Sequence, residues 1–108
     1  MPAEIVIVAD VWASEETIDR VTERLREDVE YTHANEPGVA KFALHRDVDD
    51  PLHLVMIETF ADEATLEAHR ASDFYKELMA ELPDLIVDRR RSVLSPLGYG
   101  DLDRGYLA

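Results

Sequence analysis

The sequence predicts an α+β domain in which a four-stranded antiparallel sheet carries helices on one face. The chain has 108 residues, which is the usual size of one domain. Runs rich in β-branched residues alternate with amphipathic helical segments, in the order strand, helix, strand, strand, helices, strand. That order is the split βαβ arrangement, in which the helices pack on one face of the sheet.

The first strand and the first helix are predicted before residue 36. From Ala3 to Trp12 both alternating sets of side chains are apolar, so we expect both faces of this strand to be covered. Ser14 stands where a helix cap belongs. Apolar residues then recur at helical spacing, at Ile18, Val21, Leu25 and Val29. They predict a helix packed on the sheet, with its charged residues, including Asp28, on the opposite side.

Two further strands follow that helix. Pro37 and Gly38 end the helix, since the residue before a proline disfavours helical geometry. Residues 39–46 and 52–60 are strand-like runs, joined by the sequence DVDDP. A hairpin of antiparallel neighbours is the expected result, with His45 and His53 at its solvent-exposed strand ends.

Two short helices and a last strand complete the domain. Asp62 occupies a cap position, Ser72 interrupts and recaps the helix, and Pro83 closes it. Residues 84–95 form the final strand, which carries three consecutive arginines at 89–91. Alternation directs Arg90 away from the other two, and in so acidic a chain we expect all three to pair with carboxylates, either within the chain or across the dimer.

Residues 1–95 are predicted to form the domain, and residues 96–108 a C-terminal tail. The tail keeps apolar and aromatic residues that are unusual in water, namely Tyr99, Leu102, Tyr106 and Leu107, so we expect it to pack on a partner subunit. Helices on one face leave the apolar residues on the other face of the first strand without a partner. A second copy packed face to face supplies one, which predicts a homodimer.

Charge and composition exclude several classes of function. The 11 Lys and Arg against 24 Asp and Glu give a net charge of −13, which repels nucleic acid and anionic membrane surfaces. There is no cysteine, and the sequence has no metal-ligand spacing, phosphate loop or dinucleotide fingerprint, so we expect no metal or cofactor. Since no signal peptide or membrane span is recognisable, the expected location is the cytoplasm.

The segments Glu36-Pro37-Gly38 and 58–69 (ETFADEATLEAH), with Ser72 and Phe74 following, resemble the antibiotic-biosynthesis-monooxygenase domain family over roughly residues 3–95. The resemblance implies a ferredoxin-like fold, a dimeric α+β barrel and a pocket between sheet and helices. Members include cofactor-free monooxygenases that convert phenols or hydroquinones to quinones, heme-degrading enzymes, isomerases or lyases, and chains with no known reaction. The reaction therefore stays open.

Two branches of the family differ from this chain at named positions. The heme-degrading members resemble each other in an Asn on the first strand, a Trp closing the third strand and a His on the last short helix. Here the first strand has no Asn, while Phe60 and Met79 stand at the other two positions, which removes the axial ligand of the iron. The polyketide-oxidising members also carry a Trp where Phe60 stands, and an Asn after the third strand that is missing here.

His69 and Glu58 are the candidate catalytic residues. A cofactor-free oxygenase needs a base that takes a phenolic proton, and His, or a Glu with a pKa raised by burial, meets that need. His69 follows Leu66 by three residues and shares its inward face. Its structural alternative is a hydrogen bond to a carboxylate or carbonyl. Glu58 shares a strand face with apolar residues, and its alternative is a buried partner of His69 or of an arginine on the last strand.

The candidate substrate-binding residues are Phe42, Phe60, Phe74, Tyr75 and Met79, each of which also suits a core position. The leading hypothesis is a cofactor-independent monooxygenase or quinol oxidase that uses O2 on a small aromatic or hydrophobic molecule. One alternative is an isomerase or lyase of a small polar metabolite, which needs cations in the pocket. The other is a non-catalytic dimer that binds a small molecule.

Overall fold

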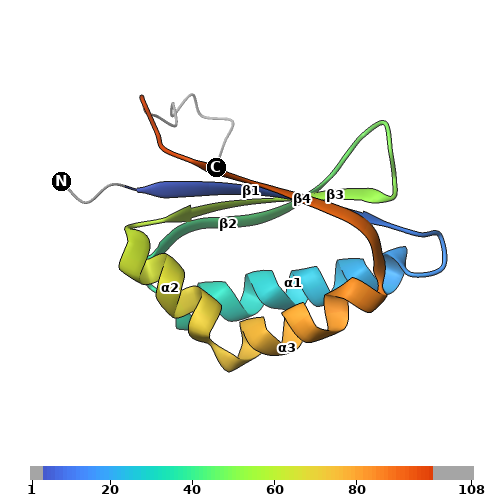
Figure 1. The fold of residues 1–108 in the computed structure, drawn as a ribbon, viewed down its shortest axis with the longest axis horizontal. Coiled ribbons are helices and arrows are strands. Elements are labelled where there is room, and N and C mark those ends of the chain that lie inside the picture. The colour runs from blue at the N-terminus through green and yellow to red at the C-terminus, as the bar shows by residue number, and fades with distance from the viewer. Residues whose placement is uncertain (1–3, 99–108) are drawn as a thin grey trace.

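A computed structural model of the chain describes residues 4–98. Figure 1 shows the sheet as one layer and the three α-helices together on one of its faces, which confirms the predicted α+β fold. Three residues of 3₁₀ helix, Leu82–Asp84, precede the last strand. The other elements are β1 (Ile5–Ala13), α1 (Ile18–Asn35), β2 (Val39–Arg46), β3 (His53–Phe60), α2 (Glu63–Ala71), α3 (Asp73–Glu81) and β4 (Ile86–Leu94).

The sheet has the strand order β2-β3-β1-β4, and each neighbouring pair is antiparallel. This order is the ferredoxin-like arrangement, in which the first and third strands lie at the centre. Ala9 on β1 lies opposite Met56 on β3 and Arg91 on β4. Because residues paired across neighbouring strands share a face, these three side chains all point toward the helices.

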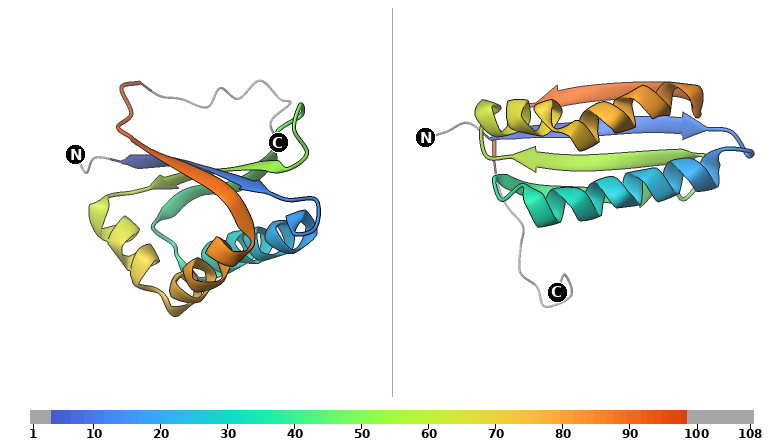
Figure 2. Two further views of the ribbon diagram at one scale, coloured as in Figure 1. Left: turned by 45° about the vertical axis from the view of Figure 1, so that its right-hand side comes forward. Right: turned by 90° about the horizontal axis from the view of Figure 1, so that it is seen from below.

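The core lies between that face and the helices. Figure 2 shows α1 running beneath one side of the sheet and α2 and α3 beneath the other. The predicted inward face of α1 is confirmed, since Ile18, Val21 and Leu25 are buried. They pack with buried residues of the sheet and the other helices, including Phe42, Leu54, Phe60, Leu66 and Leu78. Burying one such side chain contributes roughly 1.5–3 kcal/mol to folding.

The helix α1 begins at Ile18, one turn after Ser14. Ser14 makes the capping contacts expected of it, since its hydroxyl accepts the backbone N–H of Thr17 at 3.2 Å and its carbonyl accepts that of Ile18 at 2.9 Å. The Thr17 hydroxyl also donates to the Leu85 carbonyl at 2.7 Å, which ties this turn to the start of β4. The caps of α2 and α3 are as predicted: Asp62 and Ser72 each accept a backbone N–H from the first turn of the helix that follows.

The other face of the sheet carries apolar side chains that no element in residues 4–98 covers. They include Val6, Val8, Val55 and Ile57, which alternate with the buried residues of β1 and β3. The four tail residues predicted to pack on a partner, at positions 99, 102, 106 and 107, lie outside the described residues. In the part of the chain that the structure describes, no helix is long and apolar enough to cross a membrane.

Candidate active site

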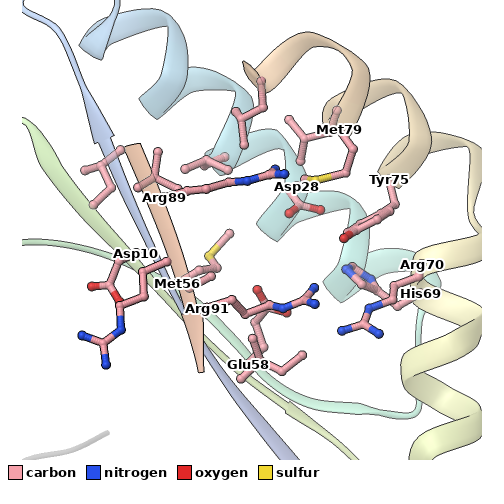
Figure 3. Close-up of a pocket in the computed structure, with 18 of the residues that line it drawn as sticks. Asp10, Asp28, Met56, Glu58, His69, Arg70, Tyr75, Met79, Arg89 and Arg91 are labelled. Atoms are coloured by element: carbon pink, nitrogen blue, oxygen red, sulfur yellow. The ribbon is translucent and has the colours of Figure 1, made fainter. Parts of the chain in front are cut away.

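A cavity of about 480 Å³ lies between the sheet and the helices (Figure 3). Apolar side chains form much of its wall, among them Ile7, Leu25, Leu54, Met56, Leu66 and Leu78. Ionisable and polar residues lie among them, namely Asp10, Asp28, Glu58, His69, Arg70, Tyr75, Arg89, Arg90 and Arg91. The volume suits a small ligand, and the combination of an apolar wall with a few converging polar groups is typical of small-molecule sites.

His69 lies in the last turn of α2, only 3% exposed, and lines the cavity. The inward orientation predicted from its spacing to Leu66 is confirmed. Its Nδ1 lies 2.7 Å from Oε1 of Glu36, so the ring donates a hydrogen bond to this carboxylate. The partner of His69 is therefore Glu36, at the C-terminal cap of α1, and not Glu58. Nε2 makes no hydrogen bond within residues 4–98 and is the nitrogen left for a ligand.

Three aromatic rings hold the imidazole in place. The ring centroids of Phe42, Phe60 and Tyr75 lie 5.2, 5.3 and 5.1 Å from that of His69. Phe42 and Phe60 are 2% and 0% exposed and are not among the residues that line the cavity. Both rings pack against His69 in the core, which is the core position that the sequence left open for them.

The Glu36-Pro37-Gly38 segment brings Glu36 to the imidazole. A Cβ on Gly38 would lie 2.8 Å from Cγ2 and 2.9 Å from Oγ1 of Thr65, in the first turns of α2. The Gly38 carbonyl also accepts the backbone N–H of Ala61 at 3.1 Å. Only glycine allows this close approach without a shift, so the position of Gly38 sets how closely the end of α1 approaches the helix that carries His69.

Glu58 lies on β3, 9% exposed, and lines the cavity among apolar neighbours, as its strand face predicted. Burial, and next the nearby Asp28 carboxyl, raise the pKa of Glu58 from 4.5 to about 8, although Arg70 and Arg91 oppose this rise. Its carboxyl makes no ion pair in the described residues. At neutral pH the side chain is therefore mainly protonated, and it can donate a hydrogen bond into the cavity.

Asp28 was predicted on the outer face of α1, and this prediction is wrong. The side chain is 5% exposed and lines the cavity, because it follows Leu25 by three residues and shares the inward face. Burial first, and then the charge of Glu36, raise the pKa of Asp28 from 3.8 to about 7, against the opposing effect of Arg24. The helical spacing from Val21 and Leu25 was the signal that could have identified it.

Arg89 and Arg91 point into the cavity, and Arg90 faces the opposite side of the sheet. Arg89 pairs with Val11 and Arg91 with Ala9, both on the helix-facing side, whereas Arg90 pairs with Asp10. Figure 3 shows Arg89 and Arg91 extending from β4 toward the helices. Within residues 4–98 none of the three arginines makes an ion pair, so the expected carboxylate partners are not found in the one chain, and pairing across a dimer stays a prediction. Their positions on an exposed edge strand leave them in contact with solvent.

Of the remaining predicted substrate contacts, Tyr75 and Met79 line the cavity and Phe74 does not. Phe74 stacks on Tyr31 with 4.6 Å between ring centroids, and the guanidinium carbon of Arg24 lies 5.4 Å from its centroid. It therefore joins α3 to α1 behind the cavity.

His53, predicted at an exposed strand end, is instead held between two carboxylates on the far face of the sheet. Its Nε2 lies 2.8 Å from Asp10 and its Nδ1 2.8 Å from Asp47. The ring also stacks on Trp12 with 4.4 Å between centroids. His45 is exposed, as predicted.

Three solved structures resemble this fold closely. Protein Rv0793 from Mycobacterium tuberculosis has a TM-score of 0.85 and 21% identity, over 92% of this chain and 100% of that one. PA3566 from Pseudomonas aeruginosa has a TM-score of 0.83 and 23% identity, over 91% and 98% of the two chains. A Bacteroides thetaiotaomicron protein, provisionally named an antibiotic biosynthesis monooxygenase, has a TM-score of 0.84 and 23% identity, over 93% and 95%. At these identities the likeness shows the fold.

Sequence comparison identifies the family. No protein in the curated set matches the chain significantly. The sequence profile described as antibiotic biosynthesis monooxygenase matches residues 4–81, which include α1, β3, α2 and most of the cavity wall. The chain belongs to the antibiotic biosynthesis monooxygenase family.

Proposed function

We propose that this protein is a cofactor-independent oxygenase that oxidises a small phenol or hydroquinone with O2. One observation carries the proposal: the His69 imidazole, oriented by Glu36 at 2.7 Å, lines a 480 Å³ cavity whose wall is largely apolar. The apolar wall suits an aromatic ring, and the free Nε2 suits a phenolic hydroxyl. A carboxylate that accepts the Nδ1–H of a histidine also stabilises the imidazolium that forms when Nε2 takes a proton.

The first step in this proposal is removal of the phenolic proton by Nε2 of His69. The phenolate is more electron-rich than the phenol and passes an electron to O2 more readily. A hydroquinone loses two electrons and two protons in all, and O2 takes up both and leaves as hydrogen peroxide. In the monooxygenase version one oxygen atom enters the ring to give a quinone and the other leaves as water.

Glu58, named from the sequence as a candidate base, suits the role of an acid better. With a pKa of about 8 it is mainly protonated at neutral pH. A protonated carboxyl can donate a hydrogen bond to the reduced oxygen species or to the carbonyl oxygen of the product. Asp28, with a pKa of about 7, can take up or release a proton in the same pH range.

Oxygen uptake tests the proposal. Purified protein is mixed with a panel of hydroquinones and phenols, and O2 consumption and quinone absorbance are followed together. Replacing a general base costs about 10²–10⁴-fold in rate, so we expect His69→Gln to lose at least a hundredfold. His45→Gln, on exposed β2 outside the cavity, is the matched control and should keep the wild-type rate. A His69→Gln variant with the wild-type melting temperature and the wild-type rate would contradict the proposed base.

A second candidate function is supported by the arginines. An isomerase or lyase of a small polar metabolite needs cations in the cavity, and Arg89 and Arg91 point into it. The two functions differ in their need for O2. Under anaerobic conditions an isomerase or lyase keeps its full rate, whereas the oxygenase stops.

We propose further that two copies pack through the face of the sheet that the helices leave open. Val8 lies on this face, beside Val6 on β1 and Val55 and Ile57 on β3. Sedimentation equilibrium should give a dimer for the native chain and a monomer for Val8→Glu. Val48→Glu, in a loop where the side chain is 96% exposed, should remain a dimer. A monomeric native protein at micromolar concentration would refute this assembly.

A further inference from the structure

We infer that the substrate is an aromatic acid, whose carboxylate binds between Arg70 of α2 and Arg91 of β4 while its phenolic hydroxyl meets His69. This inference rests on the proposed function of the cavity as a substrate site, and it names the chemical class of the substrate. Three observations carry it: the convergence of two cations from opposite walls, their lack of carboxylate partners, and their place beside the imidazole.

The two arginines come from separate elements and reach the same part of the cavity. Arg70 directly follows His69 in α2, and Arg91 extends from β4 on the helix-facing side of the sheet. Figure 3 shows both guanidinium groups beside the Glu58 carboxyl. Both arginines also lower the pKa of Glu58 through their charges, so both guanidinium groups lie close enough to this carboxyl to interact with it electrostatically. Two guanidinium groups around one point suit a planar anion, because each can form paired hydrogen bonds with carboxylate oxygens.

Neither arginine is neutralised by a carboxylate in residues 4–98, although the chain holds 24 Asp and Glu. Two arginines of α1 do have such partners: Arg20 and Arg24 both bind Glu81 at 2.8 Å. Glu58, on which both arginines act electrostatically, is mainly uncharged at neutral pH because burial raises its pKa to about 8. The cavity is thus locally cationic in a protein whose net charge is −13.

The surroundings of the two arginines fit the rest of such a ligand. Because Arg70 and His69 line the same cavity, a carboxylate held by Arg70 leaves its ring in the space that the imidazole also lines. Tyr75, Met79 and Met56 line the same cavity and can contact the faces and edges of an aromatic ring. A hydroxybenzoate-like molecule therefore satisfies the cations, the base and the apolar wall at once, whereas a neutral quinol leaves two like charges facing each other.

Calorimetric binding of two matched probes tests the inference without any turnover. 4-Hydroxybenzoate and 4-hydroxybenzamide have nearly the same shape and differ in the charge of one substituent. We expect the native protein to bind the acid at least about tenfold more tightly than the amide, as one charged, bidentate contact commonly allows. The double variant Arg70→Gln/Arg91→Gln should lose this preference. The double variant Arg26→Gln/Lys41→Gln, which removes two exposed cations outside the cavity, is the charge-matched control and should keep it.

Equal affinity for the two probes, no binding of the acid, or a preference that survives the double replacement would overturn the inference. Both arginines are on the surface side of the core, so the variants should keep the native melting temperature, which is measured alongside. The outcome is separable from that of the proposed function. Selective binding of the acid without oxygen uptake from any phenol would refute the oxygenase alone, while oxidation of neutral quinols without acid preference would refute this inference alone.

Discussion

The buried carboxyl of Glu58 predicts an unusual dependence of stability on pH, which Glu58→Gln should remove. Burial raises the pKa of Glu58 in the folded protein from 4.5 to about 8. The folded state therefore keeps a proton that the unfolded chain releases between these two values. Stability contributed by the protonated form is present at low pH and is lost as pH rises through this window.

The expected size of this effect follows from the two pKa values. Between the unfolded and the folded pKa, each rise of one pH unit lowers the free energy of unfolding by about 1.4 kcal/mol for one such group. From pH 4.5 to pH 7 the loss from Glu58 is on the order of 3 kcal/mol. A small domain has a total stability of only about 5–15 kcal/mol, so a change of this size is measurable. Asp28 also has a raised pKa, so it lowers the stability further as the pH rises from about 3.8 to 7. This second loss remains in Glu58→Gln, because Asp28 is unchanged there.

Urea unfolding at pH 5, 6, 7 and 8 measures the effect, with the conditions chosen to span roughly the window between the two pKa values. The native protein should lose stability steeply across this series, and Glu58→Gln should lose clearly less. Glu67→Gln, which removes an exposed carboxylate of α2 that makes no ion pair in residues 4–98, should follow the native curve. Parallel curves for the native protein and Glu58→Gln would refute the assignment of a buried, protonated Glu58.

Two further predictions concern Gly38 and His53. Gly38→Ala should destabilise the fold by about 1–3 kcal/mol in thermal melts, because the new Cβ would lie 2.8 Å from the Thr65 side chain. Gly98→Ala is the control and should leave the stability unchanged, since a Cβ there has nothing within 4 Å. The hydrogen bond to Asp47, and then that to Asp10, raise the pKa of His53 above 6.5. His53→Gln should therefore lower the stability of the fold by about 1 kcal/mol below pH 6.5. The loss should become smaller as the pH rises through the raised pKa of His53. Urea unfolding at pH 6 and pH 9 measures this difference, and an equal cost at both would contradict the ion-pair assignment.

The elements of the fold could be predicted from the sequence because each has a local signal. The period-two strands, the helical spacing of Val21 and Leu25, and the caps at Asp62 and Ser72 all depend on residues a few positions apart. The alternation of the arginines also predicted that Arg90 faces away from its two neighbours. These patterns were enough to assign the fold and to direct His69 inward.

The contacts that define the site depend on residues far apart in the chain. Glu36 and His69 meet across 33 positions, and His53 and Asp10 across 43, so no local pattern indicates either pair. Asp28 was misplaced for a different reason. Positions 28 and 29 both fall near the inward face of α1. Charged residues are generally exposed to solvent, so Asp28 is expected on the outer face. Buried carboxyls in candidate functional sites are exceptions to that rule.

A spectroscopic titration tests whether His69 takes a proton from a phenol that binds in the cavity. 4-Nitrophenol is added at a pH where the free ligand is mainly neutral, and its yellow phenolate band is followed as protein is titrated in. We expect the band to grow as the ligand binds to the native protein and to be absent with His69→Gln. Binding that leaves the neutral spectrum unchanged, or an equal phenolate band with the variant, would contradict it.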